Sequence, residues 1–146
     1  MTIKCTIVPV TAYQQNCSVM VCEETGKAAI FDPGGDIENI EAAIAELKII
    51  GPQKEDAFWI DKLPEWCKMT GFPHAEAFTP DQWLEDEDSV TFGKQTLAVK
   101  FCPGHTPGHV VFFHESARLA IVGDVLFQGS IGRTDFPKGD FDTLVN

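Results

Sequence analysis

Two short motifs in the last third of the chain constrain its fold most. The turn Cys102–His109 (CPGHTPGH) follows one apolar run, and Gly123–Asp124 follows another, Leu119–Val122. Side chains at the ends of separate strands can converge on one ion, and histidine and aspartate are common zinc ligands. The motifs therefore predict two strand ends whose side chains form part of a metal site, in a half of the chain that is rich in β-strands.

The candidate ligands in these motifs are His105 and Asp124. A single histidine is more often a surface or core residue, so the metal hypothesis depends on the pair. A carboxylate directly after an apolar strand is costly unless it is paired or bound to a cation. A hydrolytic zinc needs about three protein ligands, and no second ligand cluster is evident in the sequence. The sequence thus predicts half of a metal site.

The other histidines have weaker contexts. His109 is separated from His105 by a Pro-Gly pair, so the two do not share a helix face, and we expect His109 either to orient a ligand or to have a structural role. His74 and His114 are expected at the surface. Asp32, in an Asp-Pro-Gly sequence, is expected to form a turn or a cap.

A polar loop, Gln128–Asp135 (QGSIGRTD), follows the candidate ligand Asp124. It lacks the Gly-Lys-Ser/Thr ending of a phosphate loop. Arg133 and Asp135 are expected to form an ion pair that shapes this loop. The alternative, in which Arg133 binds an anionic substrate directly, stays open.

Apolar periodicity predicts the remaining elements. A helix is expected from Asp36 to about Lys48, and short helical pieces from Lys54 to Met69, interrupted at Pro64. Strands are expected at Ile3–Val8, Cys17–Cys22, Lys27–Phe31, Ser89–Thr91, Gln95–Phe101, Val110–Phe113 and Leu119–Val122.

The predicted series of helices and strands breaks off abruptly at two places. The helix ending near Lys48 runs into Ile49–Pro52 (IIGP), typical of the end of a strand, without a stop signal between them. A missing segment is therefore expected between Lys48 and Ile49. The segment Phe141–Asn146 begins an apolar helical face and stops, so we also expect a truncated C-terminus.

Composition narrows the class of protein. A single domain is expected for 146 residues, burying roughly 70% of its unfolded surface. A net charge of −11 disfavours nucleic acid and anionic membranes as partners. Five cysteines without a Cys-x-x-Cys pair favour reduced thiols, and no apolar run is long enough to span a membrane. The sequence predicts a cytoplasmic protein and carries no sign of its oligomeric state.

Four motifs occur in an order that resembles the metallo-β-lactamase superfamily, and in particular its small, glyoxalase II-like hydroxyacylglutathione hydrolases. They are Phe31–Gly35 (FDPGG), Pro103–His109 (PGHTPGH), Gly123–Phe127 (GDVLF) and Ser130–Asp135 (SIGRTD). The resemblance implies an α/β (α+β) fold, the αββα sandwich of this superfamily, incomplete in this chain. It also implies His105 as a turn ligand and Asp124 as a bridging ligand. A His-x-His-x-Asp-His loop would fall between Lys48 and Ile49, and a last histidine beyond Asn146.

The activity implied by the resemblance is metal-dependent hydrolysis of a glutathione thioester such as S-lactoylglutathione. The metal would be zinc, as one or two ions, with iron or manganese as alternatives, and it would supply a hydroxide that Asp124 orients. Arg133 and the loop around it would line the substrate pocket. Two other hypotheses stay open: an iron persulfide dioxygenase of the same fold, and a non-catalytic remnant that acts as a binding partner.

Overall fold

The computed structural model describes residues 2–10, 15–34 and 48–146. The chain divides into two compact units, which we describe separately. Unit 1 comprises Met1–Leu47, Ser89–Ala98 and Phe112–Ile121, and unit 2 comprises Lys48–Asp88, Val99–Val111 and Val122–Asn146. The helix predicted from Asp36 lies outside the described residues, apart from its last residue, Lys48. The expectation of one domain stays a prediction.

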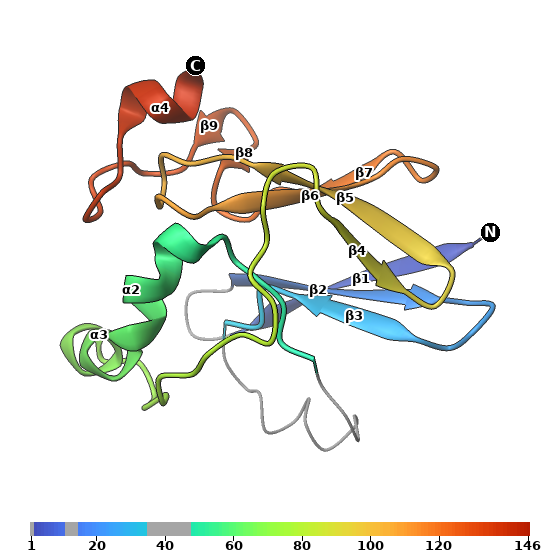
Figure 1. Ribbon diagram of the computed structural model, residues 1–146, viewed down its shortest axis with the longest axis horizontal. Coiled ribbons are helices and arrows are strands. Elements are labelled where there is room, and N and C mark those ends of the chain that lie inside the picture. The colour runs from blue at the N-terminus through green and yellow to red at the C-terminus, as the bar shows by residue number, and fades with distance from the viewer. Residues whose placement is uncertain (1, 11–14, 35–47) are drawn as a thin grey trace. The chain divides into compact units, whose positions relative to one another are not determined.

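Unit 1 contains a three-stranded antiparallel sheet, drawn in blue in Figure 1, with the order β1-β2-β3. Its strands are β1 (Ile3–Val10), β2 (Gln15–Cys22) and β3 (Ala28–Phe31). The first two pair along their whole length, from Ile3 opposite Cys22 to Val10 opposite Gln15. This confirms the three strands predicted from the sequence, the first two of which form a hairpin.

A second, four-stranded sheet has the order β4-β5-β6-β7. Its strands are β4 (Ser89–Phe92), β5 (Gln95–Phe101), β6 (Val110–His114) and β7 (Leu119–Ile121). Burial alternates along β5, as expected for a strand with one face on a core. All four strands were predicted from the sequence; β7 ends one residue earlier than expected.

The core of unit 1 joins strands of both sheets. Phe31 of β3 and Phe112 of β6 make an edge-to-face ring contact with centroids 4.9 Å apart. Met20 of β2 and Leu97 of β5 are fully buried in the same cluster. The buried cluster comprises Met20, Cys22, Phe31, Phe92, Leu97 and Ile121. Unit 1 is therefore a two-sheet sandwich held together by apolar burial.

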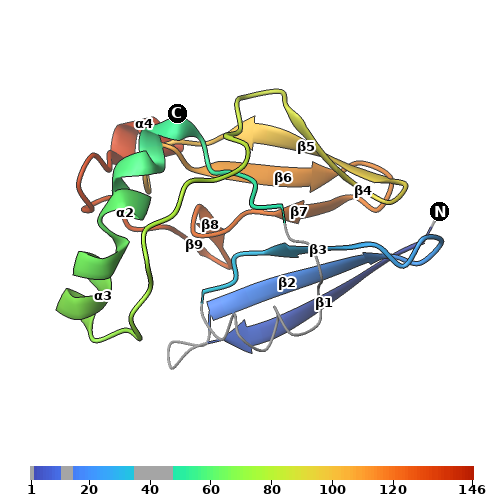
Figure 2. The ribbon, with the colours of Figure 1, turned by 60° about the horizontal axis from the view of Figure 1, so that its bottom comes forward.

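Unit 2 combines short helices with turns. A 3-10 turn η1 (Lys54–Asp56) leads into α2 (Ala57–Asp61) and α3 (Leu63–Thr70), drawn in green in Figure 2. Pro64 lies in the first turn of α3, where a missing N–H costs nothing, so the predicted interruption is confirmed. The hairpin β8 (Leu126–Phe127) and β9 (Ser130–Ile131) and the helix α4 (Phe141–Val145) follow.

The segment after Lys48 is extended, as its sequence predicts. Ile50 forms a parallel bridge with Gln82, and the backbone N–H of Ile49 donates to the carboxylate of Asp81 at 2.8 Å. Ile50, which forms this β-bridge, thus lies only two residues after Lys48, the last residue of the predicted helix.

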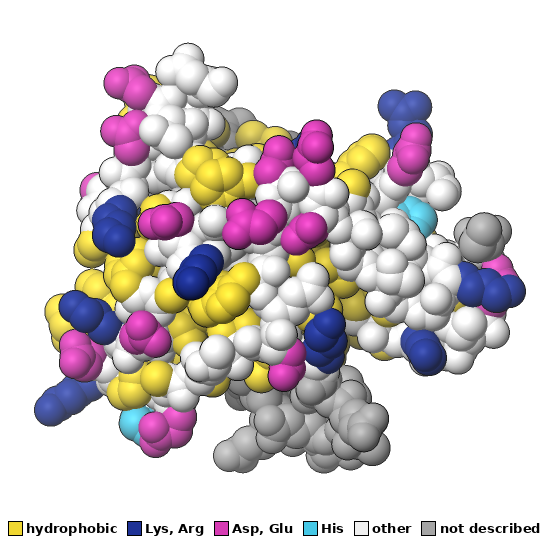
Figure 3. Space-filling view, viewed as in Figure 1, with side chains coloured by type: hydrophobic (Ala, Val, Ile, Leu, Met, Phe, Trp, Pro, Cys, Tyr) yellow, Lys and Arg dark blue, Asp and Glu magenta, His cyan; other side chains and the backbone are white. Residues whose placement is uncertain are grey.

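The surface agrees with the composition. Figure 3 shows Asp and Glu side chains at many points of the face in view, with hydrophobic side chains between them. Within the described ranges, no helix has the length and hydropathy to cross a bilayer.

Candidate metal centre

His105 is held in a fixed orientation inside unit 2. Its turn is closed by a hydrogen bond from the N–H of Cys102 to the carbonyl of His109, at 2.9 Å. The imidazole is buried, 8% exposed, and its Nδ1 lies 2.8 Å from the backbone carbonyl of Arg133. A carbonyl oxygen only accepts, so Nδ1 carries a proton and Nε2 is the nitrogen that can bind a metal. In metal-binding histidines, the ring nitrogen that does not bind the metal typically donates its N–H to such a carbonyl oxygen.

Asp124 faces that nitrogen. Its Oδ2 lies 3.7 Å from Nε2 of His105, so the structure brings the two predicted ligands together. The carboxylate side chain is 59% exposed. The expectation of a carboxylate at the end of a buried strand was therefore wrong, because β7 ends at Ile121 and the chain turns outward before Asp124.

His109 lies beside His105, with ring centroids 5.8 Å apart. Burial, followed by electrostatic interaction with His105, lowers the pKa of His109, while a hydrogen bond from the imidazole to the backbone of Val122 opposes the shift. Its Nε2 is buried and has no hydrogen-bond partner among the described residues. His109 is therefore neutral near pH 7 and places an unpaired nitrogen next to the predicted ligand.

The loop Ser130–Asp135 forms one wall of the His105 site. A Cβ at Gly132 would overlap the backbone carbonyl of Asp124 and lie 3.2 Å from Nδ1 of His105, so only glycine lets the loop pass this close. Arg133 and Asp135 make two hydrogen bonds of 2.6 Å, which confirms the predicted ion pair.

That ion pair occupies the guanidinium of Arg133. Asp135 raises the pKa of Arg133, and Arg133 lowers the pKa of Asp135. The guanidinium also stacks on the ring of Phe136 at 4.4 Å, and the same ring lies edge-on to His105 with centroids 5.2 Å apart. Direct binding of an anionic substrate by Arg133 stays a prediction.

Asp56 is a site residue that the sequence analysis missed. It is 7% exposed, and its two carboxylate oxygens accept hydrogen bonds from Thr106 and Gly108, both in the His105 turn. Burial raises the pKa of Asp56, and these hydrogen bonds oppose the shift. The sequence contains one signal that Asp56 is buried: it lies four residues before Ile60, on the same helical face, and Ile60 is buried.

The remaining candidate residues differ in whether the structure agrees with their predicted positions. His74 is exposed, as predicted, and its Nε2 lies 2.7 Å from Oε1 of Glu76. The prediction of a surface position for His114 was wrong: it is 4% exposed, bound to the buried Gln95 and to the N–H of Ala117, because β6 ends inside the core of unit 1. Asp32 has a φ of 53°, which agrees with its predicted role in a turn.

These donors do not complete a catalytic metal centre. Over residues 2–10, 15–34 and 48–146, no group of three or more His, Cys, Asp and Glu side chains could hold a metal ion. The whole chain has four histidines, and His74 and His114 are bonded elsewhere. The geometry of His105 and Asp124 fits one edge of a metal site, but two donors fall short of the three that zinc needs.

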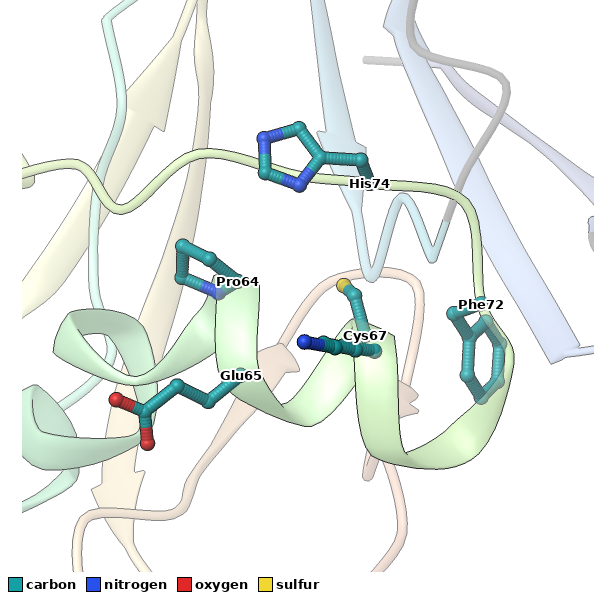
Figure 4. A pocket seen from close by; sticks show the side chains of 6 residues that line it. Pro64, Glu65, Cys67, Phe72 and His74 are labelled. Carbon is teal, nitrogen blue, oxygen red and sulfur yellow. The ribbon is translucent and has the colours of Figure 1, made fainter.

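A pocket of about 520 Å³ lies beside α3 in unit 2. Figure 4 shows that its walls come from α3 and from the loop that follows it, with His74 and Phe72 on the loop side. It is lined by Pro64, Glu65, Cys67, Lys68, Phe72 and His74. Neither predicted metal ligand lines this pocket.

Fold and motifs together define the class. The family model described as the metallo-beta-lactamase superfamily matches residues 42–146, and the chain belongs to that superfamily. The fold is the α/β sandwich of these proteins, with mostly strands and few helices among the described residues. Members are typically metal-dependent hydrolases and bind zinc or iron.

Within this superfamily, the chain is similar to several particular proteins. It is 37% identical to the hydroxyacylglutathione hydrolase GloC of Haemophilus influenzae over 170 residues, covering 96% of this chain and 80% of that protein. The structure of the BLEG-1 B3 metallo-beta-lactamase superposes with a TM-score of 0.79 at 30% identity, covering 99% of this chain and 82% of that one. The mitochondrial persulfide dioxygenase ETHE1 of Homo sapiens is 44% identical over 64 residues, 44% of this chain and 25% of that protein.

The GloC alignment also shows a difference in length. It spans 170 residues, whereas 96% of the 146 residues of this chain is about 140. About 30 residues of the aligned region (170 − 140) therefore have no counterpart in this chain.

Proposed function

We propose that this site belongs to a cytoplasmic, metal-dependent hydrolase of glutathione thioesters, with S-lactoylglutathione as its substrate and zinc as its metal. One observation carries the proposal: the Nε2 of His105, with Nδ1 tied to a backbone carbonyl, faces the carboxylate of Asp124 at 3.7 Å. The substrate class is supported by the similarity to GloC, which extends over 96% of this chain.

In this proposal His105 and Asp124 hold one side of the metal. Asp124 suits a position between metal and water because its carboxylate is exposed beside the buried imidazole. Zinc needs further ligands, and we propose that they lie in the relative's segment of about 30 residues that has no counterpart here. The β-bridge at Ile50, two residues after Lys48, supports a junction between Lys48 and Ile49.

The test begins with the chain itself. Purified protein is examined for intact mass against 16.1 kDa, for bound zinc, and for hydrolysis of S-lactoylglutathione. We expect this mass with weak zinc binding and little hydrolysis. A mass several kilodaltons larger would show that the cellular protein carries residues beyond this sequence.

A chimera then tests the missing ligands. The surplus segment of the H. influenzae relative is inserted between Lys48 and Ile49, and we expect tight zinc binding and thioester hydrolysis. His105→Gln and Asp124→Asn in the chimera serve as matched variants that lose both. A folded, zinc-loaded chimera that leaves the thioester intact contradicts the proposed substrate, and unchanged zinc binding in both variants contradicts the proposed ligands.

The partial similarity to ETHE1 favours one second candidate, a persulfide dioxygenase. Oxygen consumption with glutathione persulfide, measured on the iron-loaded chimera, separates it from thioester hydrolysis. A 16.1 kDa protein that binds no metal, and whose folded chimera gains neither zinc binding nor thioester hydrolysis, supports instead the third hypothesis, a non-catalytic remnant.

A further inference from the structure

Asp56 joins the His105 turn to a segment 50 residues earlier in the chain. Its Oδ2 accepts from the Thr106 hydroxyl and its Oδ1 from the Gly108 N–H, both at 2.6 Å. The N–H of Gln53 donates to the Gly108 carbonyl at 3.0 Å. We name the segments Gln53–Asp56 and Thr106–Gly108, with these three hydrogen bonds, the turn clamp.

The two backbones of the turn clamp are in direct contact. A Cβ at Gly108 would lie 2.5 Å from the Asp56 nitrogen and 2.5 Å from the Gln53 carbonyl oxygen. Neither atom can move aside as a flexible side chain would, so only glycine fits. The turn therefore cannot slide along the first segment without losing all three hydrogen bonds.

Capping of α2 does not account for the buried carboxylate. Asp56 immediately precedes α2, where an aspartate side chain usually accepts from the first N–H groups of the helix. Here the side chain makes no such cap hydrogen bond. Both oxygens are used by the His105 turn, and burying a carboxylate is costly unless such bonds are made.

We infer that Asp56 is a positioning residue for His105. By fixing the residue after His105 and the residue before His109, its carboxylate holds the imidazole of His105 with Nδ1 on the Arg133 carbonyl and Nε2 toward Asp124. The inference rests on the proposed function only in treating His105 as a metal ligand. The clamp itself lies wholly within the described residues.

The test is the state of the imidazoles in the metal-free 146-residue protein. Two-bond ¹H–¹⁵N spectra distinguish a proton on Nδ1 from one on Nε2, and His105→Gln assigns the signals. In the wild type we expect His105 protonated at Nδ1. In Asp56→Ala we expect its signals to move toward those of a histidine in a short peptide. Unchanged His105 signals in a folded Asp56→Ala protein would overturn the inference.

Matched variants separate positioning from folding. Glu55→Ala removes the exposed neighbouring carboxylate, and Asp56→Asn keeps an acceptor for Gly108 and a polar group for Thr106, so both should retain the wild-type signals. Thr106→Val removes one bond and should give a smaller shift. If Asp56→Ala fails to fold by circular dichroism, Thr106→Val decides, and unchanged His105 signals there overturn the inference.

A metal readout distinguishes the two proposals. Zinc affinity is measured by competition with a chelating dye, and Asp56→Ala should lower it about 10- to 100-fold, as loss of an orienting group typically does. A wild-type chain and a chimera that both bind no zinc contradict the proposed function. The imidazole spectra still decide the role of Asp56 in that case.

Discussion

The turn clamp of unit 2 and a buried polar chain in unit 1 both place hydrogen-bonding side chains where water is excluded. The polar chain consists of Cys22, Gln95, His114 and the N–H of Ala117, with Gln95 2% and His114 4% exposed. Asp56 in the clamp is 7% exposed. The clamp is built on a carboxylate that only accepts hydrogen bonds, whereas Gln95 and His114 in the chain each both donate and accept.

The direction of each hydrogen bond explains the difference. In unit 1 the Ala117 N–H donates to Nδ1 of His114 at 3.1 Å, so Nε2 carries the proton and donates to Oε1 of Gln95 at 2.9 Å. The Gln95 amide then donates to Cys22 Sγ at 3.5 Å. Gln95 and His114 thus each donate one of these bonds and accept another, and hydrogen bonds with Thr25, Lys94 and Gln95 lower the pKa of the Cys22 thiol to about 6. Asp56 only accepts, and it does so from a turn that carries functional residues.

Asp56→Ala should have the largest effect on stability. It leaves the Thr106 hydroxyl and the Gly108 N–H without their acceptor, and we expect a loss of about 3 kcal/mol in the free energy of unfolding. Urea denaturation measures it, with Glu55→Ala as a control expected within about 0.5 kcal/mol. An equal loss in both variants would assign the effect to the helix start and not to the clamp.

His114→Ala should cost less, about 2 kcal/mol, because it leaves the buried Oε1 of Gln95 without its donor. The same denaturation experiment checks it. His74→Ala, at an exposed histidine, is the matched control and should change the unfolding free energy by less than about 0.5 kcal/mol. No loss in His114→Ala would mean that water replaces the imidazole, and the contrast between the two clusters would weaken.

The elements that sequence reasoning predicted depend on neighbouring residues. Strand periodicity, the break at Pro64 and the Arg133–Asp135 pair all involve residues within a few positions of one another. The predicted ligands His105 and Asp124 followed from their places after two apolar strands, and the structure brings them together.

The residues that were missed or misplaced depend on distant partners. Asp56 bonds to a residue 50 positions away, and although its spacing to Ile60 indicates burial, the local sequence does not identify Thr106 as its partner. His114 bonds to Gln95 19 positions earlier, so its burial follows from sheet packing and not from its local sequence. The exposure of Asp124 depended on where β7 stops, and an error of one residue at a strand end changes which way a side chain points.

The charge of Asp56 makes a further difference testable by pH. Burial raises its pKa above the ordinary 3.8, so between 3.8 and the folded-state pKa the folded protein keeps a proton that the unfolded chain releases. The contribution of Asp56 to stability is therefore full below 3.8 and falls as pH rises through that window. Wild type should lose stability relative to the non-titrating Asp56→Asn as pH rises. A difference that grows in favour of wild type would show that the clamp prefers the ionised carboxylate.

The smallest effect is expected at the exposed ion pair beside the site. Asp135→Asn removes a charge from Arg133, but both side chains are well exposed, and such pairs contribute little to folding. The unfolding midpoint in urea should be unchanged, and the Nδ1 signal of His105 should stay in place because its partner is the backbone carbonyl of Arg133 and not the guanidinium. A shift of that signal as large as the one expected for Asp56→Ala would show that the ion pair, through Phe136, orients the imidazole as strongly as the clamp does. The functional distinction between the buried carboxylate and the exposed one would then fail.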